Sequence, residues 1–139
     1  MDLEIKQIGE QNFKTEFKNK GKIKTMEDLR NKYNNVIFES SSITTEQCKQ
    51  FYNDLKKVLK NILGSDYTMK ISLGHFYISG FIEKNNKFVY FSIEDLRENG
   101  EEFNSILYRT AKSFNDYTGG SNRYTELENL DIAIKNILE

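Results

Sequence analysis

The feature that most constrains the fold of this chain is a change in the spacing of its apolar residues at Gly64. Before this glycine, apolar residues recur every three or four positions, which places them on one stripe of an α-helix. From Thr68 onward the spacing falls to two, which is typical of β-strands. The helical stripe consists of Cys48, Phe51, Tyr52, Leu55, Val58, Leu59, Ile62 and Leu63. The sequence therefore predicts a helix over residues 45–63, followed by strands.

Further elements follow from the same patterns. The sequence predicts strands over residues 68–73, 75–83, 87–93 and 105–112, a helix over 26–33 and a C-terminal helix over 126–138. Residues 36–38 form a short β-prone run, and Asn85 with Asn86 is expected to make the tight turn between the second and third strands, because Asn tolerates positive φ. Thr25 is a predicted N-cap, and Thr44 with Gln47 and Thr125 with Glu128 fit capping boxes. Strands clustered between helices indicate an α+β fold, with a small antiparallel sheet packed with a long central helix and a C-terminal helix.

Residues 75–83 are expected to present aromatic rings on both faces of the sheet. Alternation places Phe76, Ile78 and Ile82 on one face and Tyr77 and Phe81, with their neighbours, on the other. One face should meet the long helix. The other should meet a second layer or a partner chain, and a homo-oligomer is one such arrangement.

Composition excludes several classes of protein. Aromatic residues make up 13% of the chain, which indicates a packed core, and the net charge of −1 favours no particular partner. The single cysteine cannot form an internal disulfide, which suits a reducing compartment. No apolar stretch approaches the roughly 20 residues of a membrane span. We expect a cytoplasmic protein with no membrane contact.

The N-terminal region carries one basic cluster. Residues 1–25 are expected to form a flexible basic arm, and residues 26–139 a single α+β domain. A solvated arm and a nucleic-acid contact both fit the cluster. Its members are Lys14, Lys18, Lys20, Lys22 and Lys24.

No complete catalytic or metal-binding motif is present. His75 is the single histidine, so a histidine-based metal site cannot form, although a general-base role stays open beside a structural one. Five acidic residues within 94–102 lack the fixed spacing of a cation site, and a solvated loop fits them better. We expect no catalytic residue, no metal and no cofactor.

The segment 109–123 is the strongest candidate for a binding site. Consecutive glycines let backbone N–H groups converge, and a helix N-terminus after them would favour an anion. Arg109 and Arg123 can each present a planar fork to phosphate or carboxylate. A purely structural turn, with Asp116 paired to an arginine, fits the same residues. The candidate ligand- or partner-binding residues are Arg109, Asp116, Tyr117, Gly119, Gly120, Asn122 and Arg123.

Residues 74–81, 90–97 and 109–123 resemble small proteins carried by phages and mobile elements of low-GC bacteria. The resemblance covers roughly residues 35–138, and 109–122 is its most specific part. Proteins of this kind include anti-CRISPR inhibitors and sponges that sequester the cyclic ADP-ribose signals of the Thoeris system. The resemblance assigns no functional role to an individual residue of this chain.

The resemblance implies a non-enzymatic anti-defence inhibitor that binds an immune effector protein or a nucleotide immune signal. The alternative is a nucleic-acid-binding accessory protein of a mobile element, which would use the basic cluster and the lysines of helix 45–63. A third hypothesis is a nucleotide-processing enzyme that uses His75 with Arg109.

Overall fold

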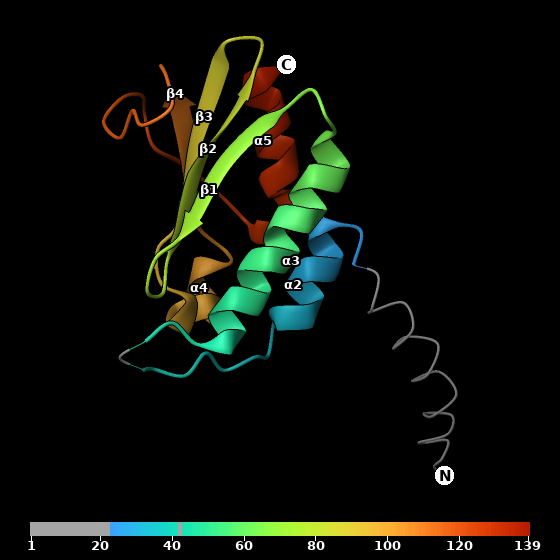
Figure 1. Cartoon of the computed structure of the whole chain (residues 1–139), viewed down its shortest axis with the longest axis vertical. Helices are drawn as coiled ribbons and strands as arrows, with labels where there is room; N and C mark the ends of the chain where they lie inside the picture. Colours follow the sequence, from blue (N-terminus) through green and yellow to red (C-terminus); the bar gives the residue numbers. More distant parts are fainter. Residues whose placement is uncertain (1–22, 42) are drawn as a thin grey trace.

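Residues 23–41 and 43–139 are described by the computed structural model of this chain, and its centre is a five-stranded antiparallel sheet (Figure 1). Each strand pairs with its neighbour in sequence, so the strand order is β1-β2-β3-β4-β5. The basic cluster at Lys14, Lys18, Lys20 and Lys22 lies outside the described residues. The strands are β1 (Thr68–Leu73), β2 (Ile78–Lys84), β3 (Lys87–Ile93), β4 (Ile106–Ala111) and β5 (Arg123–Thr125).

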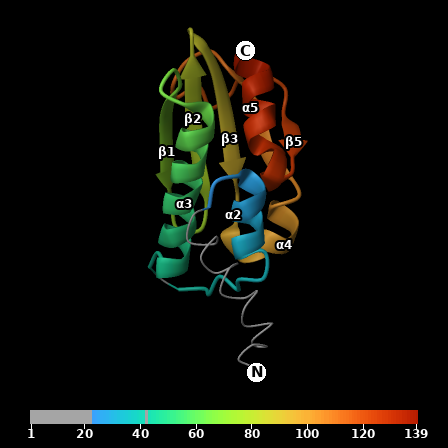
Figure 2. The ribbon, with the colours of Figure 1, turned by 90° about the vertical axis from the view of Figure 1, so that its right-hand side faces the viewer.

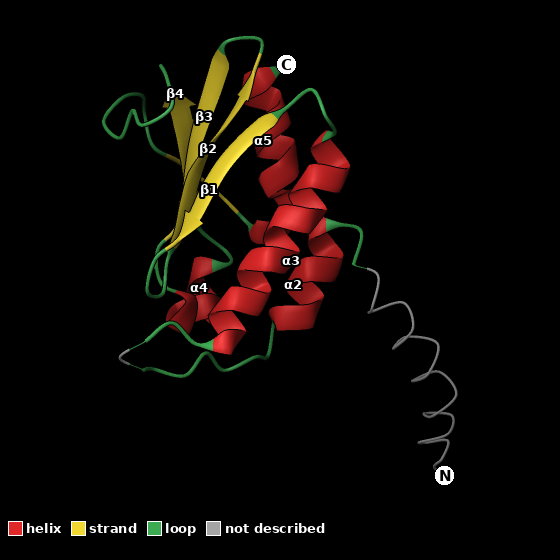
Figure 3. Ribbon diagram, viewed as in Figure 1, coloured by secondary structure: helices red, strands yellow, loops and turns green. Residues whose placement is uncertain are grey.

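Helices cover one face of this sheet. They are α2 (Met26–Tyr33), α3 (Glu46–Leu63) and α5 (Leu130–Leu138), with the short helix α4 (Asn99–Glu102) and the 3-10 turns η1 (Leu96–Glu98) and η2 (Leu127–Asn129) in the connections. Figures 1 and 2 show α2, α3 and α5 on the same side of the strands, and Figure 3 separates the two classes of element by colour. The predicted α+β class is confirmed.

Local sequence explains where α2 begins. The Thr25 hydroxyl accepts a hydrogen bond from the Asp28 N–H, and the Asp28 carboxylate accepts one from the Thr25 N–H, so the capping box is complete. The predicted helix over residues 26–33 is confirmed at both ends.

The N-cap of α3 lies one residue later in the chain than predicted. Thr45 is the N-cap, and its hydroxyl accepts from the Cys48 N–H at 3.3 Å. Gln47 has another role: its amide donates to the Ile37 carbonyl and accepts from the Glu39 N–H. The Gln47 side chain, which was predicted to form a capping box with Thr44, instead bonds the backbone of residues 37 and 39. The predicted capping box is therefore wrong.

Two adjacent threonines therefore allow a matched test of this cap. We expect Thr45→Ala to lower the free energy of unfolding by about 1 kcal/mol, because an N–H of the first turn loses its acceptor. Thr44→Ala should change it by less than about 0.5 kcal/mol. Urea denaturation measures both, and equal losses would contradict the assignment of Thr45 as the cap.

The β2–β3 hairpin turns at two asparagines, as predicted. Asn85 and Asn86 have φ values of 54° and 66°, the left-handed conformation required at both centres of a type I′ turn. The turn fixes the register Ile82↔Val89 and Phe81↔Tyr90. Ile82 and Val89 are buried in the core, so the predicted alternation of the hairpin is confirmed.

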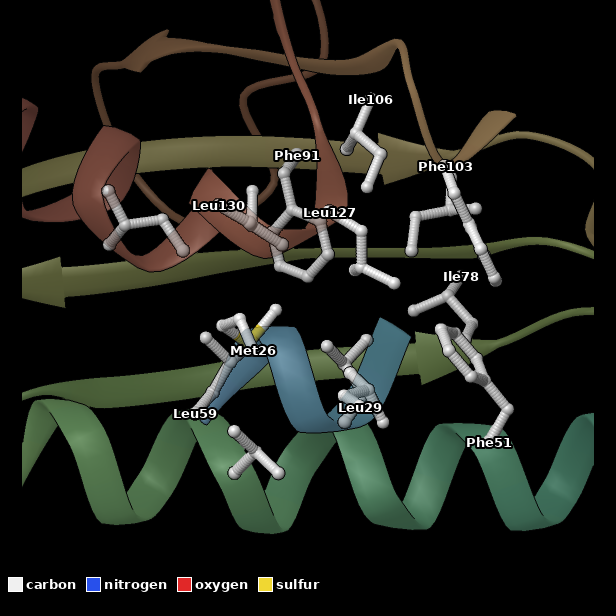
Figure 4. Close-up of a cluster of buried hydrophobic side chains, with 14 of the residues drawn as sticks. Met26, Leu29, Phe51, Leu59, Ile78, Phe91, Phe103, Ile106, Leu127 and Leu130 are labelled. Carbon is white, nitrogen blue, oxygen red and sulfur yellow. The ribbon is translucent and has the colours of Figure 1, made fainter. Parts of the chain in front are cut away.

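The core lies between the sheet and the helices (Figure 4). Phe51 of α3 stacks on Phe103 with ring centroids 5.3 Å apart and meets Tyr33 of α2 edge-on at 4.9 Å. The 3-10 turn η2 packs against α2, which places Leu127 in the same cluster. One apolar core therefore joins the first and last described helices to the sheet.

Three predicted elements differ from the structure. Residues 36–38 form no strand, because Phe38 is buried against aromatic rings and the Val36 carbonyl accepts from the Asn99 side chain. The second strand begins at Ile78 rather than at residue 75. The C-terminal helix has no capping box from Thr125, because that residue ends β5 and η2 intervenes. The short strand β5 was not predicted from the sequence.

Candidate functional site

A row of cations and aromatic rings crosses the face of the sheet opposite the helices. In register, Lys70 of β1 pairs with Phe81 of β2, Phe81 with Tyr90 of β3, and Tyr90 with Arg109 of β4. Directly paired residues of antiparallel strands point to the same face. Two aromatic rings therefore lie between a lysine and an arginine.

The loop between β4 and β5, residues 112–122, lies on the same side of the sheet as this row (Figure 1). The Tyr117 ring is 5.2 Å from Phe81 and 5.8 Å from Tyr90. Phe114 lies 6.5 Å from Phe81. Only 3% of Phe81 remains exposed, so the loop forms a small second layer over the sheet. This layer is the one expected on the second face of the hairpin.

Arg109 holds this loop against the sheet. Its side chain is 4% exposed, and its guanidinium carbon lies 4.6 Å from the centre of the Tyr90 ring. The guanidinium also donates to the backbone carbonyls of Thr110 and Asp116, at 3.5 and 3.3 Å. Part of its donor set is thus used within the chain, and Arg109 acts as an internal brace.

Asp116 organises the loop backbone. Its carboxylate accepts hydrogen bonds from the N–H groups of Lys112, Thr118 and Gly119, at 2.8, 3.2 and 3.1 Å. These bonds, led by that of Lys112, lower the pKa of the carboxyl, and the positive charge of Arg109 adds to the effect. The stabilisation is therefore complete above the ordinary aspartate pKa, and it is lost as the pH falls through the lowered value.

The two consecutive glycines allow close approach of chain segments. A Cβ at Gly119 would lie 2.7 Å from an Asp116 carboxylate oxygen. Gly120 has φ of +75°, and a Cβ there would lie 2.6 Å from the Thr110 carbonyl oxygen. The glycines therefore close the turn onto β4, and the Gly119 N–H is already bound to Asp116.

Arg109 and Arg123 do not converge on one site. Arg123 pairs with Tyr108, which packs against the core on the helix side of the sheet. Arg123 therefore projects on the opposite face from Arg109. Asn122 is exposed just before β5, and β5 and η2 separate the glycines from α5. The expectation that a helix begins directly after this loop is therefore wrong.

An open cavity of about 250 Å³ lies beside the row, between the edge of the sheet and the loop. The Lys70 ammonium lies 4.4 Å from the centre of the Phe114 ring at this cavity. Tyr117 borders it and is 60% exposed. The lining residues are Lys70, Ile71, Ser72, Ser79, Gly80, Phe81, Phe114, Asn115 and Tyr117.

Of the candidate binding residues, Tyr117 lines this cavity, and so does Phe114, which belongs to the same predicted segment 109–123. Lys70 and Asn115 were missed, and so was the role of Phe81. The alternation of the hairpin placed Phe81 on this face, but nothing local in the sequence connects residue 70 with residue 114. Their contact depends on the path of the loop across three strands.

The other candidate residues lie in structural settings. The His75 ring is exposed, with Nε2 2.5 Å from the Ser41 carbonyl oxygen, and Cys48 is fully buried. No described contact joins His75 to Arg109. Lys24 is exposed just before α2, and its N–H donates to Asp28. Within residues 23–41 and 43–139, no group of three His, Cys, Asp or Glu residues gathers where a metal ion could bind.

Comparison with protein-family models, curated proteins and solved structures finds no match to this chain. In the part of the chain that the structure describes, no helix combines the length and apolarity needed to cross a membrane.

Proposed function

We propose that this protein is a non-enzymatic binding protein that sequesters a nucleotide immune signal and so disables a bacterial defence system. The observation that carries the proposal is the cavity between β1, β2 and the β4–β5 loop, where aromatic rings lie beside Lys70. The anti-defence setting comes from the resemblance of residues 35–138 to small phage proteins.

The chemistry of the cavity suits a nucleotide. Exposed rings such as Tyr117 provide a stacking surface for a base, and the Lys70 ammonium attracts a phosphate. Ser72, Ser79 and Asn115 add donors and acceptors for base edges or ribose hydroxyls. The cavity volume of about 250 Å³ is below the roughly 300–1,000 Å³ of common ligand pockets. It therefore suits one base with its phosphate.

A thermal-shift experiment tests this function. Cyclic ADP-ribose isomers and cyclic dinucleotides are added to the purified protein, and at least one of them should raise the melting temperature. After heating, chromatography should recover the ligand intact. A chemically altered product would indicate an enzyme, and no shift with any nucleotide would reject the proposal.

Two exposed tyrosines on the same face of the sheet provide the matched variants. Tyr117 lines the cavity and is 60% exposed, whereas Tyr124 of β5 lies outside it and is 58% exposed. Tyr117→Ala should weaken ligand binding about tenfold, because one stacked base contributes roughly 1–3 kcal/mol. Tyr124→Ala should leave the affinity, measured by isothermal titration calorimetry, unchanged.

The same two tyrosine variants distinguish nucleotide binding from a second candidate function, which is binding to an immune effector protein. Tyr77, Tyr117 and Tyr124 are all at least 49% exposed, and exposed tyrosines are enriched in protein interfaces. If the target is an effector, pull-down from a defence-competent host should recover it without added nucleotide. Tyr124→Ala should then weaken binding as Tyr117→Ala does.

A further inference from the structure

A second, larger cavity lies between α3 and the edge strand β1, which run side by side in Figures 1 and 2. Its volume is about 930 Å³. We call it the lysine groove, and it is lined by Asn53, Lys56, Lys57, Lys60, Leu63, Gly64, Ser65, Tyr67, Met69, Lys70 and Ile71.

The lining of the lysine groove is cationic. Four lysines contribute to it, and none of its lining residues is acidic. On α3, Lys56 and Lys60 are one helical turn apart, about 6 Å along the axis, with Lys57 beside them. The ion pairs found among the described residues involve other lysines. Positive charge in this groove is therefore not neutralised by a described carboxylate contact.

Tyr67 contributes an uncharged phenol to the lining of the groove. Burial raises its pKa to about 12, and the hydrogen bond and negative charge of Glu139 add to the shift. The hydroxyl therefore stays protonated at neutral pH and donates to the Glu139 carboxylate. The lining residues therefore carry no negative charge of their own, and the neighbouring Glu139 carboxylate is paired with Lys84 at 3.4 Å.

Protection of an exposed strand edge explains only part of this arrangement. Lysines on edge strands discourage pairing with other chains, which accounts for Lys70. The Tyr52 hydroxyl already donates to the Ile71 carbonyl at 2.8 Å and covers that point of the edge. On α3, the Lys56 ammonium lies 4.4 Å from the centre of the Tyr52 ring. Protection of the edge strand does not account for Lys57 and Lys60, which also line the groove.

The lysine groove adjoins the cavity proposed above for the base. Lys70 and Ile71 line both, so β1 forms the ridge between them. A cationic groove beside aromatic stacking surfaces is the arrangement by which proteins bind single-stranded nucleic acid. The larger volume on the α3 side leaves room for the parts of a ligand that the smaller cavity cannot hold.

We infer that the ligand is a single-stranded oligonucleotide with several phosphates rather than a mononucleotide. One base stacks beside Phe114 and Tyr117, the chain crosses β1 at Lys70, and the following phosphates lie along Lys60, Lys57 and Lys56. The inference rests on the proposed function, because it extends the same site.

A length series tests the inference. Fluorescence anisotropy would compare adenylates of one to four nucleotides at about 50 mM salt, where phosphate contacts are strong. Affinity should rise with each added phosphate. The salt dependence of log Kd should steepen by about 0.7 per phosphate contact.

Charge reversal locates the phosphates. Lys57 and Lys60 are exposed, so the double variant Lys57→Glu/Lys60→Glu should keep its melting temperature. It should bind the tetranucleotide at least about tenfold more weakly while binding of the mononucleotide is unchanged. Lys87→Glu, at the exposed start of β3 and outside both cavities, is the matched control and should change neither affinity.

The outcomes separate this inference from the proposed function. If a mononucleotide binds in a Tyr117-dependent manner but affinity does not change with length, the oligonucleotide inference fails and the proposed function stands. If a hairpin whose bases are paired in a stable stem binds as tightly as the single-stranded tetranucleotide, the inference fails, because paired bases cannot stack on the rings. If no nucleotide of any length binds, both fail.

Discussion

Phe51→Ala is expected to lower the free energy of unfolding by about 3–5 kcal/mol, the range for deletion of a buried phenylalanine ring. Phe51 is fully buried, and its ring contacts Tyr33, Phe38 and Phe103. These contacts join α2, the segment before α3 and the segment before β4, so the cavity left by alanine lies where three parts of the chain meet.

Urea denaturation followed by far-ultraviolet circular dichroism measures this loss. Phe51→Leu retains most of the apolar volume and should cost less than half as much. Ile132→Ala, at a side chain that is 54% exposed on α5, should change stability by about 0.5 kcal/mol or less. A loss below about 1 kcal/mol for Phe51→Ala would contradict the central position of this ring in the core.

Arg109→Ala is expected to lower the free energy of unfolding by about 2–4 kcal/mol. Hydrogen bonds from a charged donor contribute roughly 1.5–3 kcal/mol, and a cation–π contact adds about 0.5–2 kcal/mol. Arg109 makes both kinds of contact, with the carbonyls of Thr110 and Asp116 and with the Tyr90 ring. Its removal also leaves the Asp116 carboxylate without a neighbouring positive charge.

Arg109→Ala should destabilise the β4–β5 loop more than it destabilises the strands of the sheet. Hydrogen exchange should accelerate at the N–H groups of Thr118 and Gly119, which are held by Asp116, while β2 and β3 keep their protection. Arg123→Ala is the matched control, because that side chain is exposed on the opposite face of the sheet. It should change the free energy of unfolding by about 0.5 kcal/mol or less. Equal effects of the two substitutions would contradict the role of Arg109 as the brace of the loop.

The sequence predicted those elements whose boundaries depend on local chemistry. Thr25 was predicted as the N-cap of α2, and the tight turn between β2 and β3 was predicted at Asn85 and Asn86. The apolar stripe of α3 was predicted because its residues repeat over five turns, which few other patterns imitate.

Elements that depend on tertiary contacts were not predicted. Residues 36–38 have a β-prone sequence, but the burial of Phe38 and the hydrogen bond from Asn99 to Val36 hold them in an irregular conformation. β5 has three residues, too few for alternation to be recognised, and it forms by pairing with β4. Neither the contacts of residues 36–38 nor the pairing of β5 with β4 can be inferred from the spacing of residues in the sequence.

The candidate site was predicted in part for the same reason. The segment 109–123 does lie beside a cavity, and Tyr117 lines it. The arginines could not be separated by sequence, because their assignment to opposite faces depends on the pairing of β4 with β5. Lys70 could not be assigned to the site from the sequence. It belongs to β1, and only the folded chain brings it into contact with Phe114 in the loop after β4.

The strand order of the sheet bears on how the chain reaches its native state. Every strand pairs with the one next to it along the chain, so each successive pairing closes only a short segment and loses little conformational entropy. Contacts between distant parts of the chain join α2 to η2 and α5 to β3 and α3. A meander of this kind can assemble strand by strand, which favours rapid folding, and the docking of α2 onto the far end of the chain closes the longest segment.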